Sequence, residues 1–505
     1  MRTHHIGYVL AFAIAALLAL GIQAEPEKRN NKFNVLFIAV DDLRPELGCY
    51  GVDYVKTPNI DSLARGSIVF RQHFVSVPTC GSSRYALLTG RSPMISGVKG
   101  GQNNALYGGP TALKQKQQPG AQSMPELFRR SGYHTVLIGK ISHTPDGKVY
   151  AYNGKGDGRS ELPNAWDEYA TPYGPWKRGW GTFFAYADGK HREDGGGHRD
   201  LLQFTVGKDA DLPDGLMADA AVAKLKELKK QNKPFFMGLG LYKPHLPFVA
   251  PKQDRDAVAE WDVPPPVFRE GMASKYVNKN SGEFYQYTMP WEASRPLGLE
   301  DAQEARRAYL ACVRYIDRQI GKILVALAVE GLADNTVVVL WGDHGFFLGE
   351  GAQWGKHTPL EDALHTPLII RAPGVAPGDS LALASTVDIY PTLLDLCKPI
   401  FTKTAHPLDG FSLMPILNGQ QTSVRQVALS TWGNAISYRM QSLRFIFEDK
   451  GGEKANMELY DMRDKAKSYT NIAEQQPDLL RGVLEQVDVW EDAVRARLKE
   501  REREQ

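Results

Sequence analysis

A cysteine and an arginine with the potential for anion chemistry stand close together in the run of residues 78–91. Cys80 leads the run, Arg84 follows, and an apolar patch comes after them. This pattern predicts a turn that feeds a short helix with Cys80 in its first turn. Free backbone N–H groups at a helix start, together with the guanidinium of Arg84, favour an anion. A thiol there should lose its proton easily, although a small buried cysteine beside a surface arginine fits the run equally well.

Two pairs of metal-ligating side chains follow apolar runs. Asp41 and Asp42 follow residues 34–40, and Asp343 and His344 come soon after a later run. Carboxylates about 4 Å apart repel each other by up to about 4 kcal/mol at an effective dielectric near 20, and a bound cation would remove that repulsion. Oxygen-rich ligation suits calcium or magnesium. An isolated Asp-Asp pair is more often a cap or a surface feature, so this prediction depends on the two pairs meeting.

Basic side chains also follow apolar runs. They are Arg84, Lys140, Lys243 or its neighbour His245, and Lys356. If they surround one pocket, its substrate should carry a compact anion with several oxygens. His143 and His245 can act as general acid and base near neutral pH. The alternative role for each histidine is hydrogen bonding at the base of a loop.

An α/β sheet would bring these groups together. Buried-strand patterns occupy residues 34–40, 134–138, 234–241 and 336–341, and amphipathic helical patterns occupy residues 123–131, 216–230 and 301–332. This alternation predicts a sheet covered by helices on both faces, with ligands bound beyond the carboxyl ends of the strands. The polar groups should therefore converge.

Length and composition predict a large domain and a smaller one. The chain has 505 residues, 43% of them hydrophobic, and a formal net charge of +2. So small a charge argues against nucleic acid as a partner. We expect a catalytic domain at residues 33–425 and a smaller α+β domain at residues 426–505, with short antiparallel strands and a charged helical tail.

The first residues have the pattern of a signal peptide. An apolar run at residues 7–20 follows Arg2, and small residues end at Ala24 before a polar stretch. We therefore predict a signal peptide at residues 1–24. The run is short for a membrane span, so we expect an exported, periplasmic or secreted protein without a stable membrane anchor.

Two irregular segments could line a substrate pocket. Residues 146–207 are rich in glycine, tyrosine and tryptophan, and residues 252–299 contain several prolines. Flat rings suit the apolar faces of sugars, and long irregular segments often carry binding residues. Packing under a long loop is an equally good explanation for any single ring.

The motifs together resemble the type I sulfatases, and especially their iduronate-2-sulfatase branch. Cys-Gly-Ser-Ser-Arg at residues 80–84 with Leu-Thr-Gly-Arg at 88–91 resembles the first signature of that family, and Gly139-Lys140 near His143 resembles the second. Further similar motifs are Val-Asp-Asp-Leu-Arg-Pro at 40–45, Lys-Pro-His-Leu-Pro-Phe at 243–248, Asp-His-Gly at 343–345, Leu-Gly-Glu at 348–350, Trp-Gly-Lys at 354–356 and Leu-Tyr-Asp at 459–461. The resemblance covers nearly all of residues 33–475.

This resemblance implies an alkaline-phosphatase-like α/β fold, with a mixed central sheet flanked by helices and a smaller C-terminal α+β domain. It also implies that a maturation enzyme oxidises Cys80 to formylglycine, whose hydrate is the nucleophile. One hydroxyl, activated by calcium, attacks sulfur and expels the sugar alcohol. The second hydroxyl then collapses the covalent sulfate ester and regenerates the aldehyde.

Individual roles follow from the same resemblance. The implied calcium ligands are Asp41, Asp42, modified Cys80, Asp343 and His344. Arg84 and Lys140 would orient the hydrate, and Lys356 would bind the sulfate. His143 would act as the base for the collapse, and His245 would protonate the leaving oxygen.

We therefore expect a calcium-dependent sulfatase acting on an O-sulfated sugar, with the 2-sulfate of a uronic acid in a glycosaminoglycan or algal polysaccharide as a candidate substrate. A phosphomonoester or phosphonate hydrolase of the same fold stays open as an alternative. A carbohydrate-binding protein that has lost the chemistry is a third reading. Two residues depart from the family pattern: Ser82 replaces the usual Pro or Ala, and Gly351 replaces a His.

Overall fold

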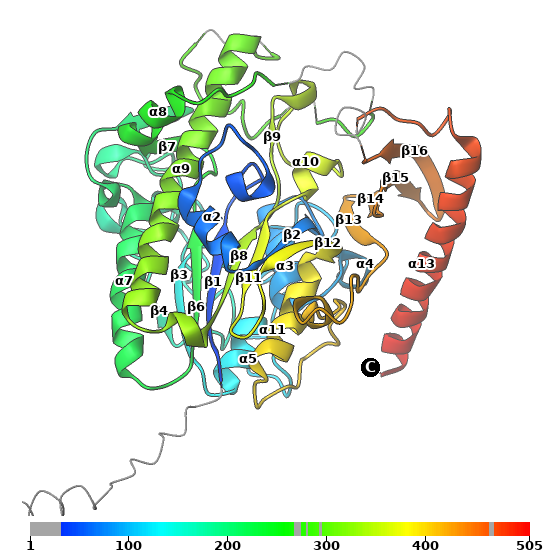
Figure 1. Ribbon diagram of the computed structural model, residues 1–505, viewed down its shortest axis with the longest axis horizontal. Helices are drawn as coiled ribbons and strands as arrows, with labels where there is room; N and C mark the ends of the chain where they lie inside the picture. Colours follow the sequence, from blue (N-terminus) through cyan, green and yellow to red (C-terminus); the bar gives the residue numbers. More distant parts are fainter. Residues whose placement is uncertain (1–31, 267–273, 279–280, 292–294, 464–468, 505) are drawn as a thin grey trace, which may run out of the picture. The chain divides into compact units, whose positions relative to one another are not determined.

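An eight-stranded mixed sheet lies at the centre of the fold (Figure 1), in the strand order β12-β2-β11-β8-β1-β6-β3-β4. Its strands are β1 (Asn34–Val40), β2 (Ile68–Phe74), β3 (His134–Gly139), β4 (Glu168–Tyr169), β6 (Phe235–Leu241), β8 (Thr336–Gly342), β11 (Leu368–Arg371) and β12 (Gly378–Ser385). β1 runs parallel to both β6 and β8, and β3 runs parallel to β6. β11 runs antiparallel to β2 and β8, which makes the sheet mixed. The four predicted strands are thus confirmed as β1, β3, β6 and β8.

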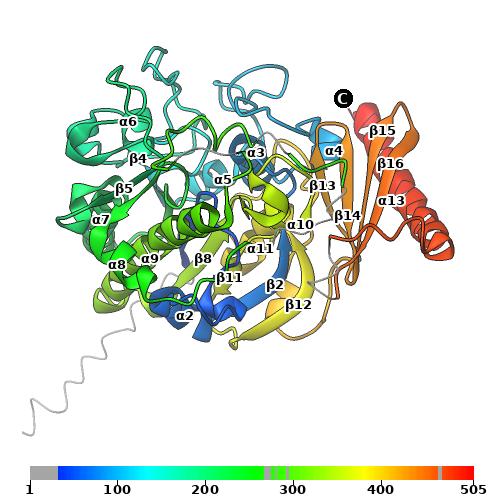
Figure 2. The same cartoon turned by 90° about the horizontal axis from the view of Figure 1, so that it is seen from above.

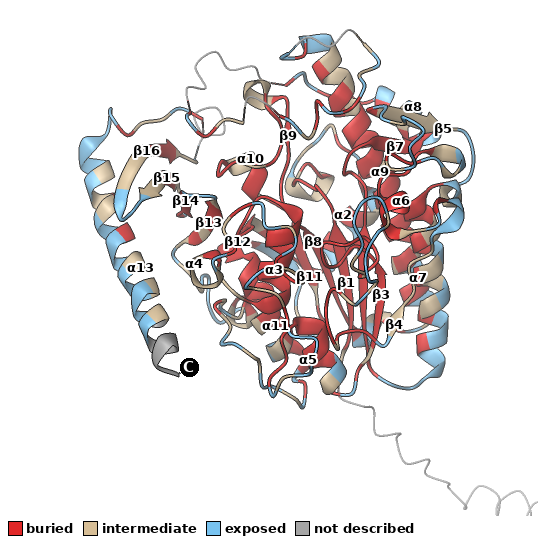
Figure 3. Ribbon diagram, turned by 180° about the vertical axis from the view of Figure 1, so that it is seen from behind, coloured by how far each residue is buried: buried red, intermediate tan, exposed pale blue. Residues whose placement is uncertain are grey.

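Helices cover both faces of this sheet, because side chains along its buried strands point alternately to the two sides. On β1, Leu36 and Ile38 pack in one hydrophobic core, while Val35 and Phe37 pack in the other. The first core contains side chains of α2 (Pro58–Arg65), α7 (Pro213–Lys230) and α9 (Leu299–Val329). The second contains side chains of α3 (Cys80–Thr89), α5 (Met124–Arg130) and α11 (Ile389–Cys397). Figure 2 shows the two layers from above, and Figure 3 shows how fully the sheet and α3 are buried.

Shorter elements join these layers. The helices among them are α4 (Pro93–Ser96), α6 (Gly179–Phe183), α8 (Lys252–Ala259), α10 (Glu361–Leu364) and α12 (Met414–Leu417). The strands are β5 (Leu202–Thr205), which pairs with β7 (Phe248–Pro251), and β9 (Phe347–Leu348), which pairs with β10 (Trp354–Gly355).

The C-terminal part is a small α+β unit, as the sequence predicted. A four-stranded antiparallel sheet, in the order β13-β14-β15-β16, comprises β13 (Ala428–Trp432), β14 (Ala435–Arg439), β15 (Leu443–Lys450) and β16 (Glu453–Asp461). The helix α13 (Pro477–Glu504) packs on it through Val483 and Val487. The small sheet also contacts the larger part of the fold, since Thr431 donates its backbone N–H to the carbonyl of Ser76, two residues after the end of β2.

The computed structural model describes residues 32–266, 274–278, 281–291, 295–463 and 469–504. Within these ranges, no helix is long and apolar enough to cross a membrane. The predicted signal peptide at residues 1–24 lies outside the described residues.

Candidate active site

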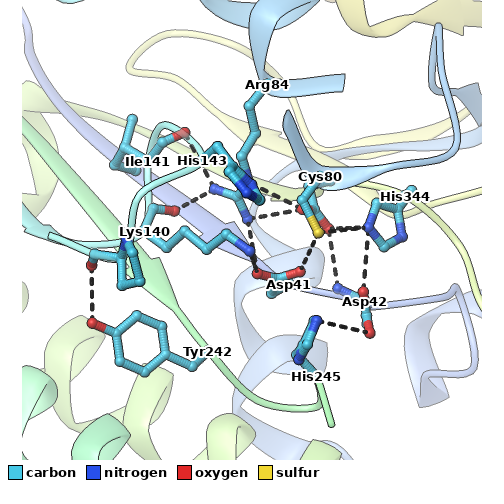
Figure 4. Close-up of polar contacts among 12 residues, drawn as sticks. Asp41, Asp42, Cys80, Arg84, Lys140, Ile141, His143, Tyr242, His245 and His344 are labelled. Atoms are coloured by element: carbon cyan, nitrogen blue, oxygen red, sulfur yellow. Dashed lines mark hydrogen bonds and ion pairs between the residues drawn. The ribbon is translucent and has the colours of Figure 1, made fainter. Parts of the chain in front are cut away.

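The carboxyl ends of β1, β3, β6 and β8 and the start of α3 meet at one edge of the sheet. The Asp41 N–H donates to the Leu241 carbonyl, and the Asp343 N–H donates to the Val40 carbonyl, so the ends of three strands are tied together. Figure 4 shows the side chains that converge there. The structure brings together all ten predicted site residues, namely Asp41, Asp42, Cys80, Arg84, Lys140, His143, His245, Asp343, His344 and Lys356.

Buried carboxylates and nitrogens at this edge form a candidate metal centre. One ligand atom each from Asp41, Cys80, Asp343 and His344 lie within 4.8 Å of one another, and Asp41, Asp42, Cys80 and His245 form a second such group. The Oδ2 atom of Asp42 is buried and has no hydrogen-bond partner among the described residues. Burial raises the pKa of Asp42 to about 7. A cation would stabilise this carboxylate, and the three aspartates supply the oxygen ligands that calcium prefers.

Cys80 is the first residue of α3 and is buried. Its thiol donates to Asp41 Oδ1 at 3.3 Å, and Sγ lies 3.2 Å from His344 Nε2 and 3.6 Å from Lys356 Nζ. Burial, and next the nearby Asp41 carboxylate, raise the pKa of Cys80 well above its usual value. The expectation of an easily lost proton is therefore wrong for the unmodified thiol, because desolvation outweighs the helix start and the lysines.

Arg84 and Lys140 hold the carboxylates from the side of α3 and β3. The Arg84 Nη2 atom lies 2.9 Å from Asp343 Oδ2, and its Nη1 donates to the backbone carbonyls of Lys140 and Ile141. Lys140 Nζ donates to Asp41 Oδ2 at 2.5 Å. Burial lowers the pKa of Lys140, but the Asp41 charge more than compensates and the net shift is upward. Both side chains are therefore fixed cations.

The two predicted acid–base histidines differ in their surroundings. His245 Nδ1 lies 2.6 Å from the Leu246 carbonyl, and its Nε2 lies 4.0 Å from Asp42 Oδ2. His143 Nδ1 has no partner within the described ranges. Burial and then Lys140 hold the pKa of His143 well below its usual value, so its ring is neutral. Burial and then Lys356 also lower the pKa of His245.

Lys356 faces the cluster, but Lys243 does not. Lys356 Nζ lies 2.8 Å from Asp42 Oδ1. Lys243 Nζ instead donates to the carbonyls of His245 and Pro247 at 2.8 and 2.5 Å. Of the alternatives "Lys243 or His245" for a pocket cation, the structure therefore excludes Lys243, whose amine stabilises the loop that carries His245.

Sequence reasoning missed Glu283 and Asn103. Glu283 Oε1 lies 3.1 Å from His245 Nε2 and its Oε2 lies 3.3 Å from Lys356 Nζ. No motif surrounds Glu283, and the only signal was its place in the proline-containing segment. Asn103 Oδ1 accepts the Gly81 N–H at 3.0 Å, and a Cβ on Gly81 would lie 2.3 Å from the Asn103 Cα. The glycine after Cys80 is therefore required for this close approach.

The aromatic segment forms the wall behind the histidines. Its rings at Trp176, Trp180, Phe183, Phe184 and Tyr186 are buried. The Phe183 ring centroid lies 4.6 Å from that of His245, and the Trp180 centroid lies 5.6 Å from that of His143. Tyr152, 45% exposed, packs on Trp180 at 4.6 Å. Most of these rings therefore position catalytic candidates, and Tyr152 remains available to a ligand.

The sequence profile of the Sulfatase family matches residues 33–399. The chain belongs to the sulfatase family. The family predicted from the motifs is therefore confirmed, and all ten converging residues lie within the matched range.

Two sulfatases illustrate this relationship. The human iduronate 2-sulfatase is 29% identical over 384 residues, which cover 73% of this chain and 64% of that protein. The chain thus spans less than two thirds of that relative. A sulfatase of Formosa agariphila is 27% identical over 464 residues, which cover 88% of this chain and 84% of that protein.

The fold has solved counterparts. The phosphonate monoester hydrolase of Silicibacter pomeroyi superposes with a TM-score of 0.69 and 23% identity, covering 90% of this sulfatase chain and 94% of the hydrolase. This match confirms the predicted alkaline-phosphatase-like architecture.

Proposed function

We propose that this sulfatase hydrolyses the O-sulfate ester of a sugar, with Cys80 oxidised to formylglycine. One observation carries the proposal: the Cys80 Sγ lies within 3.3 Å of Asp41 and 3.2 Å of His344 and 3.6 Å from Lys356. The position of the nucleophile, a set of metal ligands and a cation for the sulfate therefore coincide. An isolated structural cysteine would not need this arrangement.

Calcium would be held by Asp41, Asp42, Asp343 and His344 together with the modified residue 80. These residues supply mostly oxygen donors, and the buried Asp42 Oδ2, which has no hydrogen-bond partner in the described chain, offers a ligand atom. A bound calcium ion supplies a Lewis-acid charge that lowers the pKa of a coordinated hydroxyl. An aldehyde hydrate at residue 80 supplies a hydroxyl that can attack sulfur.

Fixed cations then stabilise the anionic sulfate group. Arg84 and Lys140 would orient the hydroxyls of residue 80, since both contact Asp41, which accepts a hydrogen bond from the Cys80 thiol. Lys356 Nζ, 2.8 Å from Asp42 Oδ1 and 3.6 Å from the Cys80 sulfur, would contact the sulfate oxygens. Buried charges of this kind are preorganised, and each such donor typically contributes about 10²–10³-fold in rate.

Two histidines carry the protons. His245 lies on the loop after β6 and can donate a proton to the leaving sugar oxygen. We assign His143 as the base that accepts a proton when the free aldehyde is regenerated.

Mass spectrometry tests the nucleophile. The tryptic peptide of residues 72–84 from protein made in its native host should carry an aldehyde mass at Cys80. Finding only free thiol would refute the formylglycine mechanism. A Cys80→Ala variant should lose turnover and keep sugar binding, whereas unchanged activity would refute the nucleophile.

A sulfated saccharide is the proposed substrate class, and the 2-sulfate of a uronic acid is a candidate, supported by the likeness to iduronate 2-sulfatase. We also propose export through residues 1–24 and a formylglycine-generating partner. A panel of defined sulfated oligosaccharides should reveal one preferred sulfate position. Turnover of none of them would reject the saccharide assignment.

A phosphate or phosphonate ester hydrolase is the second candidate, because the phosphonate monoester hydrolase shares the fold. Both ester types present similar oxygens to the same cations. Matched nitrophenyl sulfate and phosphate separate the two functions. Faster turnover of the phosphate would favour this second candidate.

A further inference from the structure

Glu283 places an additional negative charge against the proposed sulfate-binding lysine. Its two carboxylate oxygens face two different partners, His245 Nε2 at 3.1 Å and Lys356 Nζ at 3.3 Å. The side chain is 23% exposed, and its Oε2 atom is buried without a hydrogen-bond partner in the described part of the chain. Glu283 therefore belongs to the candidate site, beside His245 and Lys356, and not to an outer surface network.

This carboxylate has no part in the candidate metal centre. Asp41, Asp42 and Asp343 each contribute an oxygen to a group that can hold a cation, and neither group includes Glu283. The charge of Glu283 thus stays in the pocket when a metal neutralises the aspartates. It also offsets part of the attraction that Lys356 exerts on a bound anion.

We propose that Glu283 is a specificity-determining residue that favours singly charged esters over doubly charged phosphate monoesters. The proposal rests on the proposed function, because it assigns Lys356 to the sulfate. A sulfate monoester carries one negative charge. A phosphate monoester, with a second pKa near 6, carries about two at pH 8. The second charge would meet the repulsion of Glu283 in a partly desolvated pocket.

Electrostatics sets the size of the effect. Two like charges several ångströms apart, at effective dielectrics between those of protein and water, change a binding ratio by about 3- to 100-fold. A phosphonate monoester distinguishes an effect of the ester's charge from an effect of its central atom, because it contains phosphorus but carries only one negative charge. Glu283 should discriminate against the phosphate and ignore the phosphonate.

Three nitrophenyl esters test this inference on full-length metal-loaded enzyme at about pH 8. They are the sulfate, the phosphate and the phenylphosphonate. Glu283→Gln should raise kcat/KM for the phosphate relative to the sulfate by about tenfold, and the phosphonate-to-sulfate ratio should stay constant. Glu283→Asp keeps the charge and should largely restore discrimination. Glu260→Gln, which removes a charge from the exposed end of α8, is the matched control and should change neither ratio.

Two results would overturn the inference. A phosphate-to-sulfate ratio unchanged within twofold in Glu283→Gln, even with a parallel loss on all three esters, would mean that Glu283 only positions His245. An equal rise in kcat/KM for the phosphate and the phosphonate, relative to the sulfate, would mean that Glu283 discriminates by the central atom and not by charge.

Binding measurements keep this test separate from the proposed function. In a Cys80→Ala background, Glu283→Gln should tighten the Kd of phenyl phosphate relative to that of phenyl sulfate by about tenfold. This ratio can be measured even if wild-type enzyme turns over no sulfate ester, a result that would refute only the proposed function. An unchanged Kd ratio would refute the role of Glu283 whatever the activity.

Discussion

Two lysines near the same sheet edge have different tasks. Lys356 Nζ contacts Asp42, Glu283 and the Cys80 sulfur, all of them side-chain partners within the site. Lys243 Nζ instead donates hydrogen bonds to two backbone carbonyls, those of His245 and Pro247. Sequence position alone does not separate these roles, since each lysine lies within two residues of a histidine.

Substitution should separate the two lysines. Lys356→Ala should lower kcat/KM for a sulfate ester by about 10²–10³-fold and weaken inhibition by inorganic sulfate. Lys243→Met should leave sulfate inhibition unchanged but lower the free energy of unfolding by about 1–3 kcal/mol, because buried carbonyls lose their donor. Product-inhibition assays and urea unfolding measure the two effects. Equal weakening of sulfate inhibition in both variants would contradict the assignment.

Ser82 offers a second test at the residue scale. Its hydroxyl donates to the Gly100 carbonyl at 2.5 Å, and the neighbouring Ser83 donates to the Asp343 carbonyl at the same distance. Both serines are fully buried. They are therefore a matched pair in which only Ser82 departs from the family signature.

Ser82→Ala should raise the fraction of Cys80 that carries the aldehyde, because it restores a residue usual in that signature. Losing the hydrogen bond should cost about 1 kcal/mol of stability. Ser83→Ala should have a similar cost without any gain in modification. Peptide mass spectrometry gives the modified fraction, and equal fractions in the two variants would show that Ser82 does not limit maturation.

At the scale of elements, β3 and β6 approach each other closely where the site begins. Gly139 has a positive φ of 73°, and a Cβ there would lie 2.1 Å from the Gly240 carbonyl oxygen. A Cβ on Gly240 would lie 2.0 Å from the Lys140 carbonyl oxygen. The same Lys140 carbonyl accepts a hydrogen bond from Arg84. This close approach therefore positions Arg84 and Lys140, the two cations that contact Asp41.

Gly240→Ala should destabilise the protein by more than about 4 kcal/mol, since the clash is with backbone that cannot turn away. Gly298→Ala is the control, because nothing lies within 4 Å of a Cβ at that helix start. Thermal unfolding should show a large loss for the first variant and almost none for the second. A Gly240→Ala protein with wild-type thermal stability would contradict this account.

The sequence predicted the parallel strands at the centre of the sheet but not β2 and β11, which lie next to them on the side of β8. β1, β6 and β8 are nearly continuous apolar runs, as strands buried on both faces must be. β2 carries Arg71 and Gln72, and β11 has only four residues, so neither shows that pattern. These two segments become strands because β2 pairs with β11 and β12, which lie far from it in the sequence, and β11 also pairs with β8.

Most of the candidate site was predictable because its residues occur in short motifs at strand ends. Glu283 was not, because its contacts with His245 and Lys356 connect segments far apart in the chain. The pKa of Cys80 was also beyond prediction, since it depends on complete burial more than on the local helix.

At the scale of the whole molecule, the C-terminal sheet contacts the short helix α10 and the loop residue next to Lys356. Glu361 accepts hydrogen bonds from Arg439 and Arg444 of the C-terminal sheet. The Trp432 ring stacks on His357 at 4.9 Å, next to Lys356. The small sheet thus supports a wall of the pocket.

Acid should weaken the interaction of Glu361 with Arg439 and Arg444. Burial raises the pKa of Glu361, but Arg439 and Arg444 bring it down from 4.5 to about 2. Because the folded pKa is depressed, its stabilisation is present above about pH 4.5 and is lost as pH falls toward 2. The free energy of unfolding should fall by about 3 kcal/mol as this contribution is lost.

Glu361→Gln should therefore be less stable than wild type at neutral pH, and the difference should shrink as pH falls below about 4.5. Urea unfolding at several pH values measures it. Asp478→Asn, at the exposed start of α13, is the control and should show no such trend. If the difference in unfolding free energy between Glu361→Gln and wild type stays constant with pH, the contacts of Glu361 with the two arginines do not depend on pH.

The burial of Cys80 determines whether its proposed modification comes before or after folding. The residue is 4% exposed and lies at the start of a helix whose ten residues are all buried. An oxidising enzyme that must enclose this segment cannot reach it after the sheet has closed over it. The proposed modification therefore has to occur on a nascent or still unfolded chain, in competition with folding. A molecule that folds first would be trapped as a stable but inactive product, so the yield of active enzyme would depend on the relative rates of the two processes.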